Sequence, residues 1–528
     1  MATAQVMQQI HIRQSHPGFQ VVVASQDKNS HYKEEHDKQE RYLLSKCAAH
    51  LWHDGSYSAI CPRPVLVGKH HLQRMEDIHE ALTAAITDIV QRWWSDSDAR
   101  LPIRMPLEPE EEEHLKWLDA QTACGNIPSF AKRLGSWRPD FLVEDLQHGQ
   151  DGAPLQENFS TTEINARFSF NGYMHEVYGQ LALDKAIDEM GGEARRLVSA
   201  TSGKEIMNGL FELFRHDQPL HLLKEQEDGI DIHMFIDAVE RRLGIKPRII
   251  KPEELRLVPH SESKTGYQLY CIADQADCTG TGTDGASGSL VAATKPTVAP
   301  GALFKREVVT HDGEVLERVF QVGLELHQRE IAALSPELLR EVSLRCFNDL
   351  RTILLVHDKR MLGIVKQELP RLVARSVLTP QQSSILERGI VDTYLPGSQE
   401  LDTLLQASLS QPDVKNAYIL KPIRGGKGAG ILFGDDIDQS RWIETLKHLK
   451  LSTKVQPTSY VVQRRIVPRL YDMVLEATGE LRRYPLVGTY HVVNGRLLGL
   501  GTWRSSGSRI VAICGGGSAI CSVMRASL

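Results

Sequence analysis

Residues 418–436 read YILKPIRGGKGAGILFGDD, and four glycines and two lysines fall within ten residues of this stretch. Short apolar runs flank the glycines, which predicts a loop between two strands. Glycines let backbone N–H groups approach phosphate oxygens without a Cβ clash. The P-loop spacing G-x-x-x-x-G-K-[ST] is absent, and no helix is predicted directly after Gly430. The loop therefore reads as a flap, with phosphate binding as one hypothesis and an ordinary surface loop as the other.

Two lysines and one polar strand extend this hypothesis beyond the loop. Lys421 ends the predicted strand YILK, and Lys359 follows the apolar run Thr352–Val356, which we interpret as another strand. Lysines at two strand ends can bracket a polyphosphate, although a solvated charge is the alternative for either one alone. In the predicted strand YVVQRRI, Gln463 can hydrogen-bond an adenine edge.

Candidate magnesium ligands lie about 250 residues earlier, in WRPDF (137–141) and TTEINARFSFNGY (161–173). Glu163 and Asn165 alternate along a predicted strand, so their side chains point to the same side. With Asp140 they offer the hard oxygen ligands that one or two Mg²⁺ ions require. Arg138 can neutralise negative charge on a reacting group. A surface ion-pair patch is the alternative.

Composition indicates a soluble protein of several lobes. The 528 residues are 41% hydrophobic and 24% charged, and the formal net charge of −6 argues against a nucleic-acid binder. No apolar run approaches the ~20 residues of a membrane span, and the N-terminus lacks a signal-peptide pattern. The eight cysteines form no C-x-x-C pair, which is typical of buried thiols in a reducing compartment. We expect a cytoplasmic protein.

The chain divides into five predicted segments of α+β character. Residues 1–40 are polar and expected to be poorly ordered; residues 41–125 are helical, with Ile78, Leu82, Ala85, Ile89 and Trp93 on one face. Strands are predicted in 126–215. Residues 216–345 hold a helix–strand unit and a Gly/Ser/Thr-rich insertion near 278–300, which we interpret as a surface loop. Residues 346–528 hold the glycine loop and a hairpin that turns at Asn494–Gly495.

The motifs in about residues 126–528 together resemble the ATP-grasp superfamily of ADP-forming carboxylate–amine ligases, in the circularly permuted form of the glutathionylspermidine synthetase type. The metal segment precedes the lysines and the glycine loop, which is the permuted order. The resemblance implies a circularly permuted ATP-grasp fold, with an adjoining α/β (pre-ATP-grasp-like) domain and an N-terminal helical region. Residues 126–215 would form its metal-binding half, 216–345 its substrate side and 346–528 its nucleotide-binding half.

The resemblance also implies roles for individual residues. Asp140, Glu163 and Asn165 look like the Mg²⁺ ligands, and Arg138 looks like the arginine that faces the acyl phosphate. The residues similar to the ATP-binding set are Lys359, Lys421, Gly425, Gly426, Lys427, Gly428, Gly430, Gln463 and Arg464. The stretch Gln463-Arg464-Arg465 stands where many ATP-grasp enzymes have an acidic residue. Arg504, in GTWRSSGSRI, either contacts phosphate or substrate or has a structural role.

The expected function is ATP-dependent formation of an amide from a small carboxylate and a small amine, which are expected to be amino acids, peptides or polyamine-like molecules. ATP and Mg²⁺, as two ions, are the expected cofactors, with neither nucleic acid nor membrane as a partner; a homo-oligomer is left open. No Ser/His or Cys/His nucleophile set is evident in the sequence. A nucleotide-binding regulator and a small-molecule kinase on the same fold are the alternatives.

Overall fold

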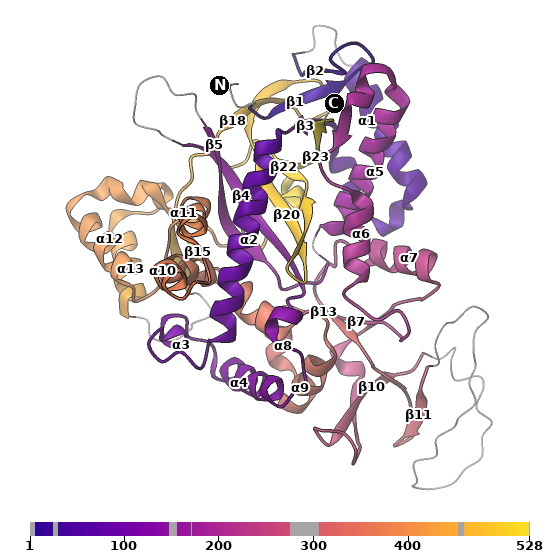
Figure 1. Ribbon diagram of the computed structural model, residues 1–528, viewed down its shortest axis with the longest axis vertical. Helices are drawn as coiled ribbons and strands as arrows, with labels where there is room; N and C mark the ends of the chain where they lie inside the picture. Colours follow the sequence, from indigo (N-terminus) through magenta and orange to yellow (C-terminus); the bar gives the residue numbers. More distant parts are fainter. Residues whose placement is uncertain are drawn as a thin grey trace.

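A large, mostly antiparallel sheet forms the centre of the computed structural model (Figure 1), which describes residues 6–24, 30–146, 156–170, 172–274, 306–451 and 459–526. In spatial order its strands are β2 (Phe19–Val21), β1 (Gln8–Ile12), β3 (Ile60–Leu66), β23 (Ser518–Arg525), β22 (Trp503–Ser505), β20 (Val487–Val493), β4 (Ser136–Leu146) and β5 (Gln156–Asn165). β21 (Arg496–Leu500) pairs with β20, and β6 (Leu197–Ser199) with β23. Strands from both ends of the chain thus share one core.

The two faces of this sheet differ in what covers them. Helix α2 (Lys69–Gln91) crosses one face (Figure 1), where Trp137, Phe141 and Trp503 join its apolar residues in one core. Helices α5 (Tyr173–Met190) and α6 (Gly203–Phe211) belong to the core that includes Val493 and Ala519 of the sheet, with α1 (Ser30–Lys46) and α7 (Ile232–Leu243) beside them. Because strand residues alternate between faces, the polar residues between those aromatic residues point away from α2.

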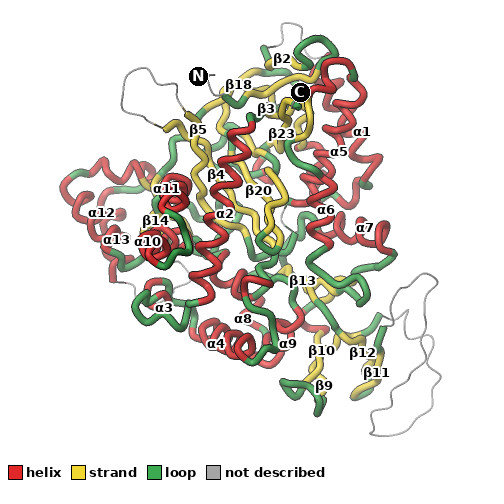
Figure 2. The backbone as a smooth tube through the Cα atoms, in the orientation of Figure 1, coloured by secondary structure: helices red, strands yellow, loops and turns green. Residues whose placement is uncertain are grey.

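A smaller sheet carries the glycine loop. Its order is β14 (Thr393–Tyr394), β17 (Tyr460–Arg464), β15 (Tyr418–Pro422) and β16 (Leu432–Phe433), and α12 (Gln399–Ser410) and α13 (Gln439–Leu451) pack on it. Helices α10 (Arg360–Ala374) and α11 (Pro380–Gly389) lie between it and α2 (Figure 2). The loop connects two antiparallel strands, as predicted.

The remaining elements form the lower part of the molecule in Figure 1 and its upper rim. Parallel strands β13 (Val322–Glu325), β7 (His221–Lys224) and β8 (Arg248–Ile250) form one sheet. Another contains β11 (Val308–His311), β12 (Glu314–Arg318), β10 (Tyr267–Ile272) and β9 (Leu255–Pro259), while β18 (Leu470–Val474) pairs with β19 (Leu481–Pro485). The short helices are α3 (Leu101–Arg104), α4 (Pro109–Ala123), α8 (Gln328–Ala333) and α9 (Pro336–Arg345). The predicted insertion near 278–300 lies outside the described residues.

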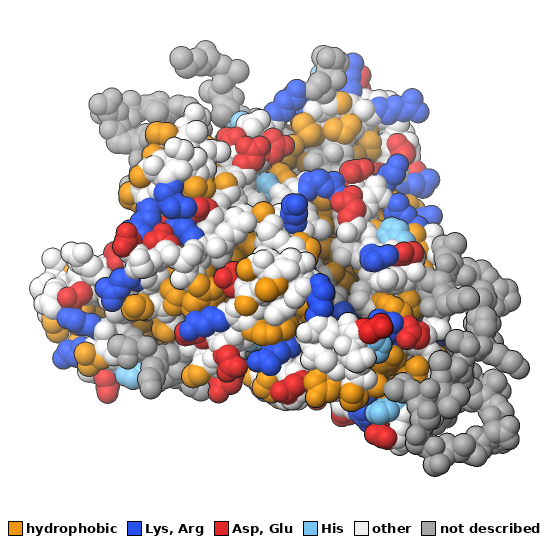
Figure 3. Space-filling view, turned by 60° about the horizontal axis from the view of Figure 1, so that its bottom comes forward, with side chains coloured by type: hydrophobic (Ala, Val, Ile, Leu, Met, Phe, Trp, Pro, Cys, Tyr) orange, Lys and Arg blue, Asp and Glu red, His pale blue; other side chains and the backbone are white. Residues whose placement is uncertain are grey.

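Several sequence predictions are confirmed. The predicted face of α2 is buried, and the predicted helix–strand unit is present as α7 followed by β8. Strands β20 and β21 turn at Asn494 and Gly495, with φ of 48° and 78°. On the face shown in Figure 3, acidic and basic side chains are interspersed, as the mixed charge pattern suggests. Among the described residues, no helix combines the length and apolarity that a membrane span requires.

The prediction that residues 1–40 are poorly ordered is wrong for the described part of that segment. Gln8 and Gln9 pair with Leu66 and Val65 of the central sheet, and α1 begins at Ser30. The Gln9 amide also accepts from the Val474 backbone N–H at 2.7 Å, and its own N–H donates to the Arg63 carbonyl at 3.2 Å. Polar composition gave the wrong prediction because a polar side chain such as that of Gln9 is buried with hydrogen-bond partners.

The predicted strand Thr352–Val356 is also wrong. The segment is a π-helical turn that runs through residues 357–359 into α10, so Lys359 lies at a helix N-terminus and not at the end of a strand. All five residues of the turn are buried. A short apolar run without periodicity cannot distinguish a buried strand from a buried helix.

Candidate active site

The predicted metal ligands come together on the face of the central sheet that points away from α2. Arg138 lies opposite Asn165, and Asp140 lies opposite Glu163, in the antiparallel pair of β4 and β5. On the other side of β4, Thr489 of β20 lies opposite Asp140. The period of two along each strand therefore collects the acidic and amide oxygens that the sequence singled out.

A bulge in β5 shapes this cluster. The pairing register shifts between Asp140 and Phe141, so Thr162 is an extra residue in its strand. Its hydroxyl donates to the Asp140 carbonyl at 3.3 Å, and its own carbonyl accepts from Lys421 Nζ at 3.4 Å. The Gln463 amide donates to the same carbonyl at 3.1 Å. Bulges commonly redirect side chains beside functional sites, and this one joins the two sheets through the backbone carbonyl of Thr162.

Both predicted phosphate-binding lysines face Glu163. Lys359 Nζ lies 3.5 Å and Lys421 Nζ 3.7 Å from Glu163 Oε2, although the lysines come from α10 and β15. Burial alone would raise the pKa of Glu163, but the ammonium groups of Lys421 and Lys359 hold that pKa well below its usual range. Burial lowers the pKa of Lys421, an effect that Glu163 partly offsets. Lys359 therefore lies beside Lys421, although it stands at the start of a helix and not at the end of a strand.

Both predicted arginines face Asp140. Arg504 Nη2 donates to Asp140 Oδ2 at 2.5 Å, and Arg138 Nε lies 3.3 Å from Asp140 Oδ1. Asp140 is 3% exposed, and each arginine side chain is 15% exposed. The cluster as a whole sets four cationic side chains against two carboxylates. Positive charge is therefore in excess, and a polyphosphate would neutralise it.

Several buried polar atoms around these ion pairs make no hydrogen bond in the described structure. They are Asn165 Nδ2, Arg167 Nε, His357 Nε2, Thr489 Oγ1, Arg504 Nε and both ring nitrogens of His491. Burial is the main factor that lowers the pKa of His491 to about 3, so its imidazole is neutral at physiological pH. Buried polar groups are normally hydrogen-bonded, so a concentration of exceptions at one place indicates a ligand site. The carboxylates and the amide fit a magnesium ion, and the remaining donors fit an anionic ligand.

The glycine loop closes over this cluster from the small sheet. Lys359 Nζ donates a short hydrogen bond to the Gly425 carbonyl, so the loop and the lysine are joined directly. Lys427, Gly428 and Gly430 have φ of 54°, 74° and 75°. A Cβ on Gly428 would lie 2.3 Å from Ile510 Cγ2, so the loop also packs against the C-terminal region. These contacts hold the loop against its neighbours in the conformation that its glycines permit.

Other predicted ATP-binding side chains have protein partners. Lys427 Nζ pairs with Asp228 Oδ2 at 2.6 Å, and Arg464 makes a two-pronged ion pair with Glu144 at 2.8 and 2.9 Å. Gln463 is 1% exposed and donates to Thr393 Oγ1 at 3.0 Å as well as to Thr162. The structure therefore places Gln463 beside the cluster with its amide donor engaged, and Lys427 and Arg464 away from the two carboxylates.

Several polar residues of this site were not predicted from the sequence. Thr489 and His491 alternate along VGTYHVV, and Arg167 follows Glu163 by four residues in EINAR, so alternation along these stretches was the available signal. The contribution of the N-terminal region was not predicted either: Glu111 of α4 pairs with Arg424 of the glycine loop at 2.6 and 2.8 Å. No local pattern predicts a contact between residues more than 300 positions apart.

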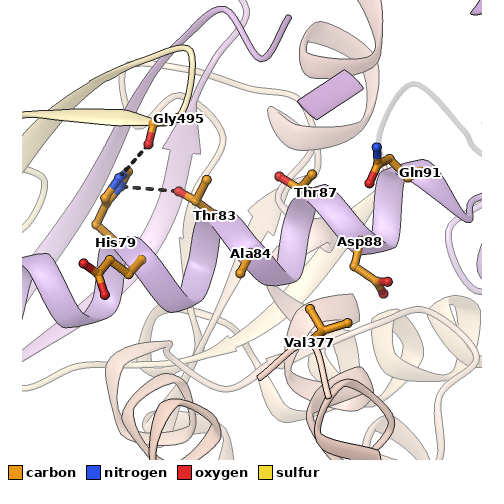
Figure 4. Close-up of a pocket in the computed structure, with 9 residues that line it drawn as sticks. His79, Thr83, Ala84, Thr87, Asp88, Gln91, Val377 and Gly495 are labelled. Carbon is orange, nitrogen blue, oxygen red and sulfur yellow. Dashed lines mark hydrogen bonds between the residues drawn. The ribbon is translucent and has the colours of Figure 1, made fainter. Parts of the chain in front are cut away.

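A shallow groove along α2 lies elsewhere (Figure 4). His79, Thr83, Thr87 and Gln91 line it, with Gly495 of the hairpin turn and Val377. The His79 ring is fixed by the Gly495 carbonyl at 3.0 Å. None of the predicted site residues lines this groove.

Matches from the comparison with known proteins include the following three. The family model "AnkG N-terminal domain" matches residues 78–355. The ATP-grasp enzyme ankG of Aspergillus thermomutatus is 34% identical over 452 residues, which cover 85% of each chain. A glutathione synthetase-like effector from Globodera pallida, solved in its apo form, matches 96% of this chain and all of its own, with a TM-score of 0.50 and 11% identity. That last likeness shows a shared fold alone, and the first two show that the chain belongs to the AnkG family of ATP-grasp enzymes.

Proposed function

We propose that this chain is an ADP-forming carboxylate–amine ligase that makes an amide bond through an acyl phosphate. The observation that carries the proposal is the buried cluster in which Lys359, Lys421, Arg138 and Arg504 surround Asp140 and Glu163. A site that transfers a phosphoryl group needs this combination of carboxylates for a metal and cations for phosphate oxygens. The proposal includes the circularly permuted order of the ATP-grasp halves.

The residues of the cluster have different proposed roles. Asp140, Glu163 and Asn165 would hold magnesium, which neutralises phosphate charge when bound. Lys359 and Lys421 would bind phosphate oxygens of ATP, and the glycine loop would cover them and exclude water. A substrate carboxylate displaces ADP from the γ-phosphate, and an amine then displaces phosphate from the acyl phosphate. Arg138 and Arg504 stabilise the negative charge that develops on the acyl group in both steps.

The buried polar groups without hydrogen-bond partners indicate where the substrates would bind. Arg167, Thr489 and His491 extend the cluster beyond the two arginines. Burial lowers the pKa of Arg167, with Glu227 and Glu330 opposing that effect. Buried, unpartnered donors of this kind suit a carboxylate-bearing small molecule. We therefore propose small carboxylate and amine substrates, of the amino acid, peptide or polyamine class, and a cytoplasmic site of action.

The test is an assay of ADP release with ATP and Mg²⁺ against pooled amino acids and polyamines. Release that depends on one pool, with a new amide mass, supports the ligase. A phosphorylated product without an amide would indicate a kinase, and tight ATP binding without turnover would favour a nucleotide-binding regulator. In the active pool, Glu163→Gln should lower the rate about 100-fold or more, because a metal ligand is lost.

A surface variant provides the matched control. Glu480 is 58% exposed at its side chain and pairs with Arg482 alone among the described ion pairs. Glu480→Gln makes the same chemical change outside the cluster and should leave the rate within about twofold, since exposed pairs contribute little. Full activity of Glu163→Gln would show that the metal assignment is wrong.

A further inference from the structure

Three residues outside the ATP-grasp cluster form a hydrogen-bonded chain of hydroxyl, imidazole and carboxylate. Ser56 Oγ lies 2.8 Å from His175 Nε2, and His175 Nδ1 lies 2.5 Å from Asp231 Oδ1. Ser56 belongs to the short 3-10 segment His53–Ala59, His175 to the first turn of α5, and Asp231 directly precedes α7. The three residues are 119 and 56 positions apart, which is why the sequence showed no nucleophile set.

The carboxylate and the imidazole are held rigidly. Asp231 is fully buried, and its second oxygen accepts the Met174 backbone N–H at 2.9 Å. Burial alone would raise the pKa of Asp231, but His175, the Met174 backbone N–H and His491 together lower it, so the carboxylate is ionised. His175 is 3% exposed, and the Trp52 ring meets it edge-on at 5.2 Å. The ionised carboxylate fixes the tautomer with a proton on Nδ1, which leaves the Nε2 lone pair facing Ser56.

The hydroxyl differs from its neighbours on the same segment. Asp54 and Gly55, directly before Ser56, both have left-handed backbone conformations, with φ of 48° and 67°. Ser56 is partly exposed, whereas its two partners are buried. Ser58, two residues later, donates to the Gly55 carbonyl at 3.0 Å, which is an ordinary local hydrogen bond. Ser56 alone of these two hydroxyls is directed at an oriented base.

The site opens beside the tip of the glycine loop. His53, at the start of the segment that carries Ser56, has its Nε2 4.0 Å from Asp228 Oδ2. The same oxygen pairs with Lys427 of the loop at 2.6 Å. The segment that carries Ser56 is therefore joined to the glycine loop through Asp228.

We propose that Ser56 is an activated nucleophile that takes an acyl group from a carboxylic ester or thioester. His175 Nε2 accepts the hydroxyl proton while Ser56 Oγ bonds to the acyl carbon, and Asp231 stabilises the imidazolium that forms. His175 then returns the proton to the departing alcohol or thiol. Water repeats the sequence on the acyl-serine, which releases the carboxylic acid and restores Ser56. This activity uses neither ATP nor metal and does not depend on the proposed ligase function.

The test uses the full-length chain and an alkyl fluorophosphonate, which forms a P–O bond with an activated serine and loses fluoride. In the absence of ATP and Mg²⁺, the wild type should gain one adduct, mapped to Ser56 by peptide mass. Ser56→Ala should gain none. His175→Gln should react about 100-fold more slowly, because its base is lost. Ser58→Ala is the matched control and should react at the wild-type rate.

Each contrary result overturns the proposal. An unlabelled wild type would show that Ser56 is not activated, and a full adduct on Ser56→Ala would place the reactive residue elsewhere. Wild-type labelling of His175→Gln would remove the imidazole from the mechanism. If His175→Gln fails to fold, comparison of the wild type with Ser56→Ala and Ser58→Ala still tests the proposal, because neither substitution removes a buried side chain. Hydrolysis of p-nitrophenyl acetate by the same three proteins then tests turnover of the acyl-serine.

Discussion

At the scale of single residues, the cluster contains one lysine whose charge depends on its neighbours. Lys421 is 6% exposed, and its nearest carboxylate is Glu163 at 3.7 Å. A buried ammonium is costly unless it is paired, and this one is shared between a carboxylate and the Thr162 carbonyl. Such a cation gains most from a bound phosphate, because the ligand supplies the charge that the protein provides only in part.

Lys421→Gln should therefore weaken ATP binding by about 10- to 100-fold, which corresponds to roughly 1.4–2.8 kcal/mol. Titration calorimetry with Mg²⁺ and ATP measures it. Lys415→Gln is the control, since Lys415 precedes β15 in the 3-10 segment Pro412–Ala417 and its Nζ donates to the Gly434 carbonyl at 2.7 Å. Equal affinities of the two variants would exclude Lys421 from phosphate binding.

A second residue-scale prediction concerns pH. Glu176 is fully buried, and burial raises its pKa to about 8 despite a hydrogen bond from Gln180. In the unfolded chain the carboxyl titrates near 4.5, so between these values the folded state holds a proton that the unfolded state has lost. The free energy of unfolding therefore falls as pH rises through this window, by up to about 5 kcal/mol in total.

Glu176→Gln removes this titration and should flatten the pH dependence of the thermal midpoint between pH 5 and 9, with the variant more stable above pH 8. Scanning calorimetry at intervals of one pH unit measures the midpoint. Glu189→Gln on the same helix is the control, because Glu189 is exposed and pairs with Lys38 and Lys185. An unchanged slope in Glu176→Gln would mean that Glu176 is already ionised in the folded protein.

At the scale of elements, sequence periodicity predicted some structures and had no means to predict others. The face of α2 and the alternation of Glu163 and Asn165 were readable because each repeats a regular period toward one core. The run Thr352–Val356 was not, since every residue in it is buried and no period remains. The bulge at Thr162 depends on pairing with a strand about 20 residues away, so local periodicity does not predict it. The Ser56–His175 contact depends on tertiary packing and was unpredictable for the same reason.

The glycine loop allows an element-scale prediction with a control inside the same loop. Gly428 has φ of 74°, and a Cβ there would meet Ile510 at 2.3 Å, whereas a Cβ on Gly426 would meet nothing within 4 Å. Gly428→Ala places a side chain on a residue in the left-handed conformation, which costs about 1–2 kcal/mol locally. The new Cβ would also clash with Ile510. The substitution should lower ADP release about 10-fold or more without changing the thermal midpoint of the core. Gly426→Ala should retain activity, and equal activity in both variants would show that the loop conformation is not required.

At the scale of the whole molecule, the N-terminal region is part of the same body as the proposed ATP site. Strands β1 and β3 lie in the central sheet, and α4 reaches the glycine loop through Glu111. Arg424 joins that carboxylate to Asp358, which directly precedes Lys359. Residues 1–125, whose role the sequence did not reveal, therefore help to hold both the loop and a phosphate-binding lysine.

Glu111→Gln should show this coupling. The side chains of Glu111 and Arg424 are 9% and 15% exposed, so removing the carboxylate leaves a largely buried guanidinium with a single, longer contact at 3.4 Å to Asp358. Loss of one partner from such a pair costs about 2–4 kcal/mol, and the thermal midpoint should fall together with ADP release. Glu113→Gln, two residues along α4, removes a carboxylate that is 76% exposed and 3.5 Å from Arg340, and should cost no more than about 1 kcal/mol. Both variants lose one negative charge from the same helix. Equal decreases in the thermal midpoint and in ADP release would therefore attribute these decreases to net charge. Only larger decreases in Glu111→Gln would show that α4 supports the loop.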